Sequence, residues 1–159
     1  MQPRGSWLII ATIVASIIFY LVPLPFDWRW FRPELPLMVL FYWVLALPQR
    51  VGIFSAMSLG LALDLLDGIA VGAIAAGSSV GVLVILLNYQ RLRQFDALQQ
   101  TFVIGLILAV VLIVVERLQN SLGFSSDGLQ FLYSIPLSML LWIPLRNLLR
   151  SFRRYYEVA

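Results

Sequence analysis

The chain has 159 residues, of which 61% are hydrophobic and only 12% are charged, and its formal net charge is +3. Because soluble domains carry about 25% charged residues, this composition excludes a water-soluble globular enzyme and a disordered chain, and it predicts an integral membrane protein. The sequence contains no cysteine, histidine or lysine, which excludes disulfides, zinc sites built on Cys or His, Ser-His-Asp triads and Schiff-base lysines.

Six hydrophobic stretches are candidates for membrane-spanning helices, which need about 20 mostly apolar residues each. In chain order they are 7–24, 35–47, 51–66, 69–87, 101–118 and 129–145. Short loops connect them, and a basic C-terminal tail, 146–159, follows the last stretch. We therefore expect an all-α integral membrane protein in which a single transmembrane domain covers residues 1–159.

Two of these stretches need a separate interpretation. The first, 7–24, is predicted to be an uncleaved span, since its apolar run exceeds that of a signal peptide and no A-x-A cleavage site follows it. The second, 35–47, is short, because thirteen helical residues rise about 20 Å whereas the hydrocarbon core is about 30 Å thick. A short full span, a span extended by residues 28–31 and a re-entrant segment all remain open for it.

The arginines predict the orientation, since positive charges favour the cytoplasmic side. With six full spans and the N-terminus inside, eight arginines fall on the cytoplasmic side: Arg4, Arg50, Arg91, Arg93, Arg146, Arg150, Arg153 and Arg154. Three fall outside: Arg29, Arg32 and Arg117. We therefore expect both termini in the cytoplasm.

Small residues recur along the third stretch. Gly52, Ala56 and Gly60 are spaced by four residues and Asp64 continues the row, so that on a helix they share one stripe. Such stripes let helix backbones approach closely in lipid. The favoured interpretation is packing of the third helix against the fourth, which has a similar stripe, and the alternative is a face reserved for a helix of another protein.

Two carboxylates lie one turn apart near the outer end of the third stretch. Asp64 is costly within a span unless it is paired, so we expect it to pair with an outer arginine or to accept a hydrogen bond from a loop backbone. The outer arginines are Arg29, Arg32 and Arg117. Asp67 followed by Gly68 is typical of a tight turn, with Asp67 predicted to cap the fourth helix. The two acids share one helix, so they do not form an aspartic-protease dyad.

Two basic segments are predicted on the cytoplasmic side. The polar segment 88–100, with Arg91 and Arg93, is expected to be the longest cytoplasmic loop and a platform for a soluble partner. The C-terminal arginines are spaced for one helical face, where contact with anionic lipid is expected, a protein partner is the alternative and nucleic acid is not expected. These arginines are Arg146, Arg150, Arg153 and Arg154.

Three runs of residues in the first half of the chain form a further pattern. They are Phe31-Arg32-Pro33, the string YWVLALPQRV at 42–51, and GLALDLLDG at 60–68, followed by Gly72. This pattern resembles the rod-shape-determining protein MreD family of Gram-negative bacteria. Length, number of expected spans and the basic C-terminal end extend the resemblance to nearly the whole chain, although Asp67 departs from the small or apolar residue of the family.

The resemblance implies a function that composition does not show. MreD-like proteins belong to the machinery for lateral cell-wall synthesis and have no assigned catalytic activity. Their direct partner is the bitopic protein MreC, and the wider complex contains MreB, RodA and a class B penicillin-binding transpeptidase. Their fold resembles the six-helix substrate-binding (S) components of energy-coupling factor transporters.

On this basis we expect a multi-pass scaffold of the bacterial inner membrane that has no cofactor and no enzymatic activity. The surface expected to bind MreC is intramembrane and outer-facing, and it comprises Tyr42, Trp43, the small stripe and the first outer loop. The segment 88–100 is expected to face MreB. Two alternatives remain open: a small-molecule-binding subunit of a membrane transporter, with a polar pocket on the outer side, and a homodimer that buries part of the small-residue surface.

Overall fold

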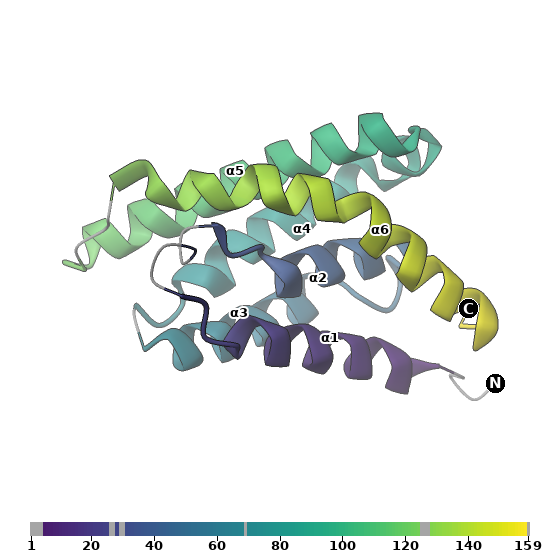
Figure 1. Ribbon diagram of the computed structural model, residues 1–159, viewed down its shortest axis with the longest axis horizontal. Coiled ribbons are helices and arrows are strands. Elements are labelled where there is room, and N and C mark those ends of the chain that lie inside the picture. Colours follow the sequence, from purple (N-terminus) through teal and green to yellow (C-terminus); the bar gives the residue numbers. More distant parts are fainter. Residues whose placement is uncertain (1–4, 26–27, 29–30, 69, 125–127, 159) are drawn as a thin grey trace.

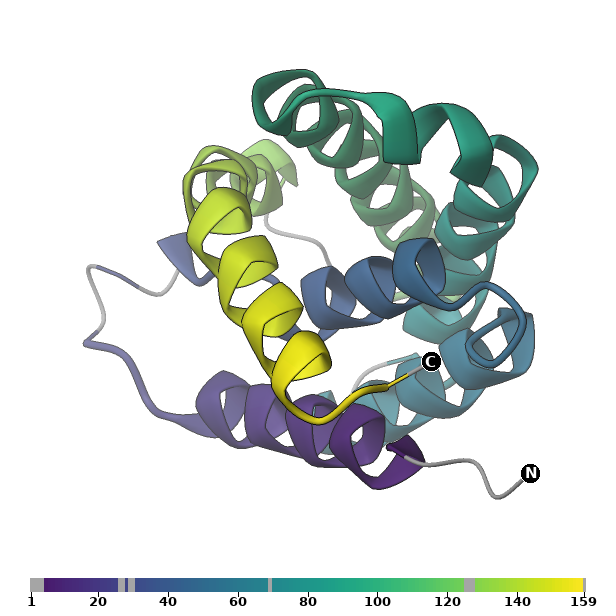
Figure 2. The ribbon, with the colours of Figure 1, turned by 90° about the vertical axis from the view of Figure 1, so that its right-hand side faces the viewer.

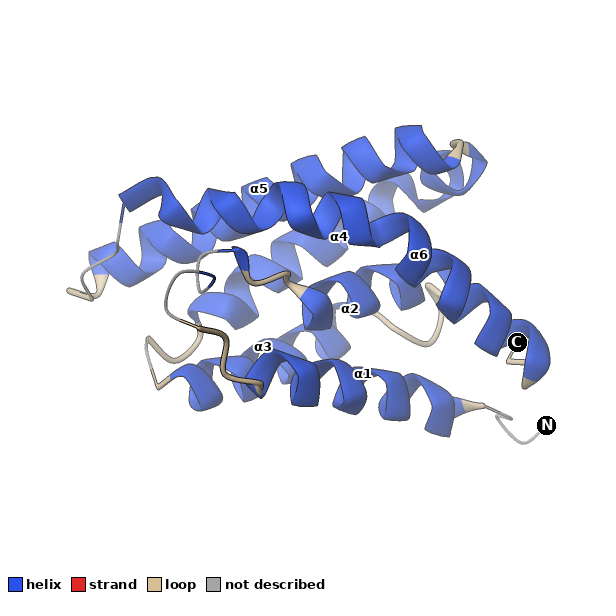
Figure 3. Cartoon of the chain, viewed as in Figure 1, coloured by secondary structure: helices blue, strands red, loops and turns tan. Residues whose placement is uncertain are grey.

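The computed structural model describes residues 5–25, 28, 31–68, 70–124 and 128–158. All regular elements in these ranges are helices (Figure 3), so the expected all-α class is confirmed. They are α1 (Ser6–Leu21), α2 (Leu35–Ala46), α3 (Ile53–Asp67), α4 (Ala73–Gln94), α5 (Ala97–Ser121), the short 3-10 helix η2 (Gly128–Tyr133) and α6 (Ser134–Tyr155).

The helices run alternately in opposite directions along one axis (Figure 1). Gly5 and Val158 therefore meet at the same end of the bundle. We call the end with the start of α2 and the start of α4 the carboxylate end, because Glu34, Asp64 and Asp67 lie there. The opposite end, where α4 finishes and α5 begins, is called the arginine end.

α2 is the central helix, and the other helices surround it (Figure 2). Residues 36–45, ten of its twelve, are buried. A helix that is apolar on all sides buries its whole circumference, and α2 does so against neighbouring helices. Its bounds match the expected stretch 35–47 closely, because Pro36 favours the first turn and Pro48 follows the last. Residues 32–34, just before it, are not helical, and the expected extension by residues 28–31 lies partly outside the described residues.

Among the described residues, α4 and α5 are long and apolar enough to cross a membrane by length and composition, whereas α1 and α2 are shorter apolar helices. Large apolar side chains also cover the outside of the bundle, among them Phe54, Leu87 and Leu140. An apolar outer surface of this kind suits contact with lipid. Six full spans, an S-component-like arrangement and cytoplasmic termini remain predictions.

The loop expected at the arginine end is wrong, whereas the C-terminal arginines lie on a helix, as their spacing predicts. α4 continues to Gln94 and α5 begins at Ala97, so most of the segment 88–100 is helical. α6 continues to Tyr155 through most of the expected tail. Apolar runs mark only the part of a helix that avoids water, whereas Arg, Gln and Leu extend the same helix into a polar region.

α6 changes direction along its length (Figure 1). Pro144 lies inside this helix, where it removes one backbone hydrogen bond and its ring clashes with the preceding turn, which bends a helix. The bend positions the C-terminal half of α6, with its arginines, at the arginine end of the bundle.

Candidate functional site

Asp64 is the hydrogen-bond acceptor for the start of α4. The N–H groups of Gly72, Ile74 and Ala75 donate to its carboxylate at 2.8, 2.9 and 3.3 Å, and its side chain is only 1% exposed. The first N–H groups of a helix have no partner within the helix, and its N-terminus favours negative charge. The expected hydrogen bond from a loop backbone is thus confirmed for Asp64.

Asp67 has a different role from the predicted one. The hydroxyl of Tyr20 donates to its two carboxylate oxygens at 3.2 and 2.9 Å, which joins α1 to the end of α3. Asp64, one turn earlier, takes the capping role that was predicted for Asp67. The predicted turn is present, since Gly68 ends α3 with φ 64°, a conformation that favours glycine.

Arg32 stacks on Tyr20 and does not pair with Asp64. Its guanidinium carbon lies 4.1 Å from the centre of the Tyr20 ring, a cation–π contact. Its Nε atom is buried without a hydrogen-bond partner. Of the other predicted arginines, Arg117 does not bond to Asp64 either, and Arg29 lies outside the described residues.

Glu34 completes the carboxylate end, just before α2. Its backbone N–H donates to Oγ of Ser138 at 3.1 Å and so joins the start of α2 to α6. Burial raises the pKa of the Glu34 carboxyl to about 7, and the negative charge of Asp67 acts in the same direction, while Arg32 acts against both.

We expect Glu34→Gln to flatten the pH dependence of stability. In the folded protein the Glu34 carboxyl stays protonated up to about pH 7, whereas the ordinary pKa of this group is 4.5. The stabilising contribution of the neutral form is therefore complete below about pH 4.5 and is lost as the pH rises through 7. Glutamine stays neutral, so the melting temperature of the variant in detergent should fall less than that of the wild type between pH 5 and 8. Glu157→Gln, at an exposed carboxylate, should keep the wild-type profile, and a parallel profile for Glu34→Gln would contradict the assignment.

The small stripe forms the contact between α3 and α4. Oγ of Ser78 donates to the carbonyl oxygen of Ala56 at 3.0 Å, and a Cβ atom on Gly60 would lie 2.5 Å from the backbone nitrogen of Ala75. Gly52 does not belong to this contact, because it precedes α3 and an added Cβ there meets nothing within 4 Å. The buried members of the stripe pack within the chain, so a partner could reach them only if α3 and α4 separated.

Tyr42 and Trp43 lie in the core. Trp43 is 0% exposed, and its Nε1–H donates to Oγ1 of Thr12 at 2.9 Å, which joins α2 to α1. The rings of Tyr42 and Trp43 meet edge to face with centres 5.5 Å apart. Trp43 is thus covered by the chain itself, contrary to the expected partner surface, whereas Tyr42 reaches a pocket at the arginine end.

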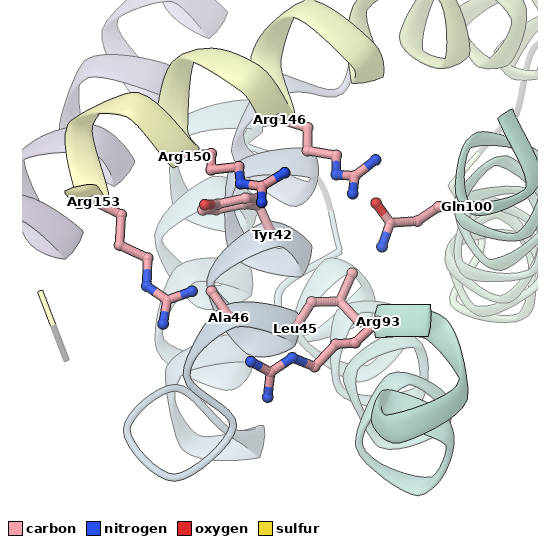
Figure 4. A pocket seen from close by; sticks show the side chains of 8 residues that line it. All are labelled: Tyr42, Leu45, Ala46, Arg93, Gln100, Arg146, Arg150 and Arg153. Atoms are coloured by element: carbon pink, nitrogen blue, oxygen red, sulfur yellow. The ribbon is translucent and has the colours of Figure 1, made fainter. Parts of the chain in front are cut away.

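This arginine pocket has a volume of about 230 Å³ and lies between α2, α4, α5 and α6 (Figure 4). It brings Arg93, expected in a loop, together with three of the four arginines expected to contact lipid. Arg91 and Arg154 do not line it. The lining residues are Tyr42, Leu45, Ala46, Arg93, Gln100, Arg146, Arg150 and Arg153.

Gln100 is the pocket residue that the sequence did not single out. It lies near the start of α5, beside the last turn of α4, where its Nε2 donates to the carbonyl oxygen of Leu92 at 3.0 Å. Because the sequence predicts a loop over 88–100, it gives no reason to expect a buried glutamine in this segment.

In the described part of the chain, the helices, the apolar outer surface and the ability of α4 and α5 to cross a membrane indicate a helical, membrane-associated protein. The family described as rod shape-determining protein MreD matches residues 1–152, and the chain belongs to this family. It is similar to the rod shape-determining protein MreD of Haemophilus influenzae, with 30% identity over 146 residues that cover 92% of this chain and 90% of the relative. No solved structure matches the chain. The resemblance seen in the sequence is confirmed, and with it a role in rod shape determination.

Proposed function

We propose that the protein is a non-catalytic membrane scaffold of the cell-elongation machinery, which binds MreC and supports lateral peptidoglycan synthesis. The family match over residues 1–152 carries this proposal. The carboxylate end supports it, because Asp64 and Asp67 are engaged by the backbone of α4 and by Tyr20.

We further propose that the protein crosses the inner membrane several times with its arginine end in the cytoplasm. Of the nine arginines in the described ranges, two lie towards the carboxylate end, Arg32 and Arg117. The other seven lie towards the arginine end: Arg50, Arg91, Arg93, Arg146, Arg150, Arg153 and Arg154. The positive-inside rule favours this orientation, which would also place the exposed Arg91 where MreB could reach it.

The partner surface is proposed on outward faces of the helices. Phe54 and Leu65, on α3, are 87% and 70% exposed, whereas the small stripe of the same helix faces α4. Helices associate in lipid by close packing, and a helix of MreC can pack only against side chains that it can reach. RodA and the transpeptidase belong to the wider complex in this proposal.

Co-purification with site-specific crosslinking tests the proposal. We expect the tagged protein, extracted in detergent, to recover MreC, and photo-crosslinkers placed at Phe54, Leu65, Phe102 or Leu106 to form an adduct with MreC from at least one helix. A crosslinker at the buried Ala56 is the matched control and should form none. Recovery of an ATPase module or a small ligand without MreC would contradict the scaffold and support the transporter alternative.

The transporter alternative has less support from the site. It requires polar groups that converge on a pocket at the outer side, but Asp64 and Asp67 are already engaged within the chain. The arginine pocket lies at the opposite end, which would be cytoplasmic in the proposed orientation.

A further inference from the structure

We propose that the arginine pocket is a binding site for a phosphate group on a ligand that also carries a hydroxyl or amine donor. This site is separate from the proposed scaffold surface and does not depend on it. The ligand class covers two sources, the headgroup of an anionic phospholipid and a free phosphate compound.

The positive charge of the pocket favours the binding of an anion. Arg93, Arg146, Arg150 and Arg153 approach it from two helices, and no carboxylate is among the lining residues. Glu157 instead lines an adjoining pocket that shares Arg150 and Arg153. Like charges that share a small space repel one another, so an anion between them would relieve this repulsion.

The shape of the cations selects phosphate among anions. A guanidinium presents a planar fork of N–H groups that matches two oxygens of a phosphate. Figure 4 shows the side chains of Arg146 and Arg150 extending from α6 over the pocket, with Arg93 across from them. The volume of about 230 Å³ is below that of sites for drug-sized ligands, so it suits a phosphate with a short substituent rather than a nucleotide.

Gln100 is a second and independent sign of a ligand. The side chain is only 4% exposed, and its Oε1 atom is buried without a hydrogen-bond partner. The amide points into the pocket, across from Arg146 (Figure 4). Buried polar atoms are almost always hydrogen-bonded, and an acceptor such as Oε1 needs a donor. A ligand that offers both phosphate oxygens and a hydroxyl, as phosphatidylglycerol does, would satisfy the arginines and Gln100 together.

Ligand-dependent melting of the delipidated protein in detergent tests the site. The probes are phosphatidylglycerol, zwitterionic phosphatidylcholine and inorganic phosphate. We expect phosphatidylglycerol or inorganic phosphate to raise the melting temperature and phosphatidylcholine to leave it unchanged. A response to the lipid alone identifies a headgroup as the source, and a response to inorganic phosphate identifies a soluble phosphate. The absence of both responses would overturn the proposal.

Matched variants separate this site from general surface charge. The double variant Arg146→Gln, Arg150→Gln should lose at least about tenfold in affinity for the effective probe, since each arginine contributes a charged hydrogen bond. Arg154→Gln and Arg91→Gln remove exposed arginines that do not line the pocket and should keep the wild-type response. Equal losses in all of these variants would show nonspecific attraction and overturn the site. The melting temperature of each variant without ligand verifies that it is folded.

Gln100→Leu tests the donor part of the proposal. Phosphatidylmethanol carries the same phosphate as phosphatidylglycerol but has no hydroxyl on its headgroup. If the lipid is the source, the wild type should bind phosphatidylglycerol more tightly, and Gln100→Leu should bind the two equally. If soluble phosphate is the source, glycerol 3-phosphate and methyl phosphate serve as the matched pair. An unchanged preference in Gln100→Leu would remove this residue from the site.

Discussion

Asp64→Ala is expected to lower the free energy of unfolding by at least about 3 kcal/mol, since it leaves three backbone N–H groups of α4 without an acceptor and each costs about 1–3 kcal/mol when buried. Gly72, Ile74 and Ala75 donate these hydrogen bonds. In lipid the full cost of the unpaired N–H groups applies, because no water molecule replaces the lost acceptor. We therefore expect low yield and a strongly reduced melting temperature in detergent.

Two further variants make this prediction specific. Asp64→Asn keeps one acceptor oxygen and should recover part of the stability. Asp96→Ala is the matched control, because Asp96 precedes α5 as an exposed residue whose side chain makes no capping hydrogen bond. If Asp64→Ala and Asp96→Ala had equal melting temperatures, the carboxylate of Asp64 would not stabilise α4.

Hydrophobic runs and prolines were sufficient to locate the helices. α2 and α3 begin and end within two residues of the stretches 35–47 and 51–66, because turn-forming residues bracket both. α4 and α6 continue seven and ten residues beyond the expected spans 69–87 and 129–145, since a helix that leaves the apolar region continues with polar residues and hydropathy no longer follows it.

Hydropathy cannot distinguish a side chain that faces lipid from one that faces another helix, because lipid tails are as apolar as leucine. Trp43 is therefore expected on a partner surface although it is buried within the chain. For Ala56 the sequence leaves two interpretations open, a partner face and the favoured packing against the fourth helix, and the structure shows the packing. That α2 occupies the centre of the bundle follows from the packing of the other helices around it, and its own sequence shows only that it is apolar on every side.

The polar contacts could not be fully predicted from the sequence, because they depend on which distant segments come together in the fold. For Asp64, the sequence leaves an arginine and a loop backbone as alternatives, and only the position of Gly72, Ile74 and Ala75 beside its carboxylate decides between them. The hydrogen bond from Tyr20 to Asp67 joins residues 47 positions apart. Arginine spacing predicts one face of α6, but not that this face lies opposite Arg93 and Gln100 in a shared pocket.

Gly60→Ala is expected to push α3 and α4 apart and to destabilise the protein by about 3 kcal/mol, at the upper end of the usual cost of overpacking. The new methyl group would overlap the backbone of Ala75, with its Cα and nitrogen closest, and the carbonyl carbon of Ile74 at 2.9 Å. Backbone cannot rotate away as a side chain can. Alanine favours a helix by about 1 kcal/mol over glycine, so a loss of stability here would come from packing alone.

Gly52→Ala provides the matched control, because the two glycines belong to one sequence stripe but differ in surroundings. An added Cβ at Gly52 meets nothing within 4 Å, and its φ of −136° is open to any residue, so its melting temperature should stay near that of the wild type. Co-purification of MreC gives a second readout. If Gly60→Ala kept the wild-type melting temperature and lost MreC, the stripe would be a partner face rather than the internal contact of α3 with α4. The expected result is that Gly60→Ala loses stability, that Gly52→Ala does not, and that Gly52→Ala still recovers MreC. This result would place the partner on an outward face of the bundle.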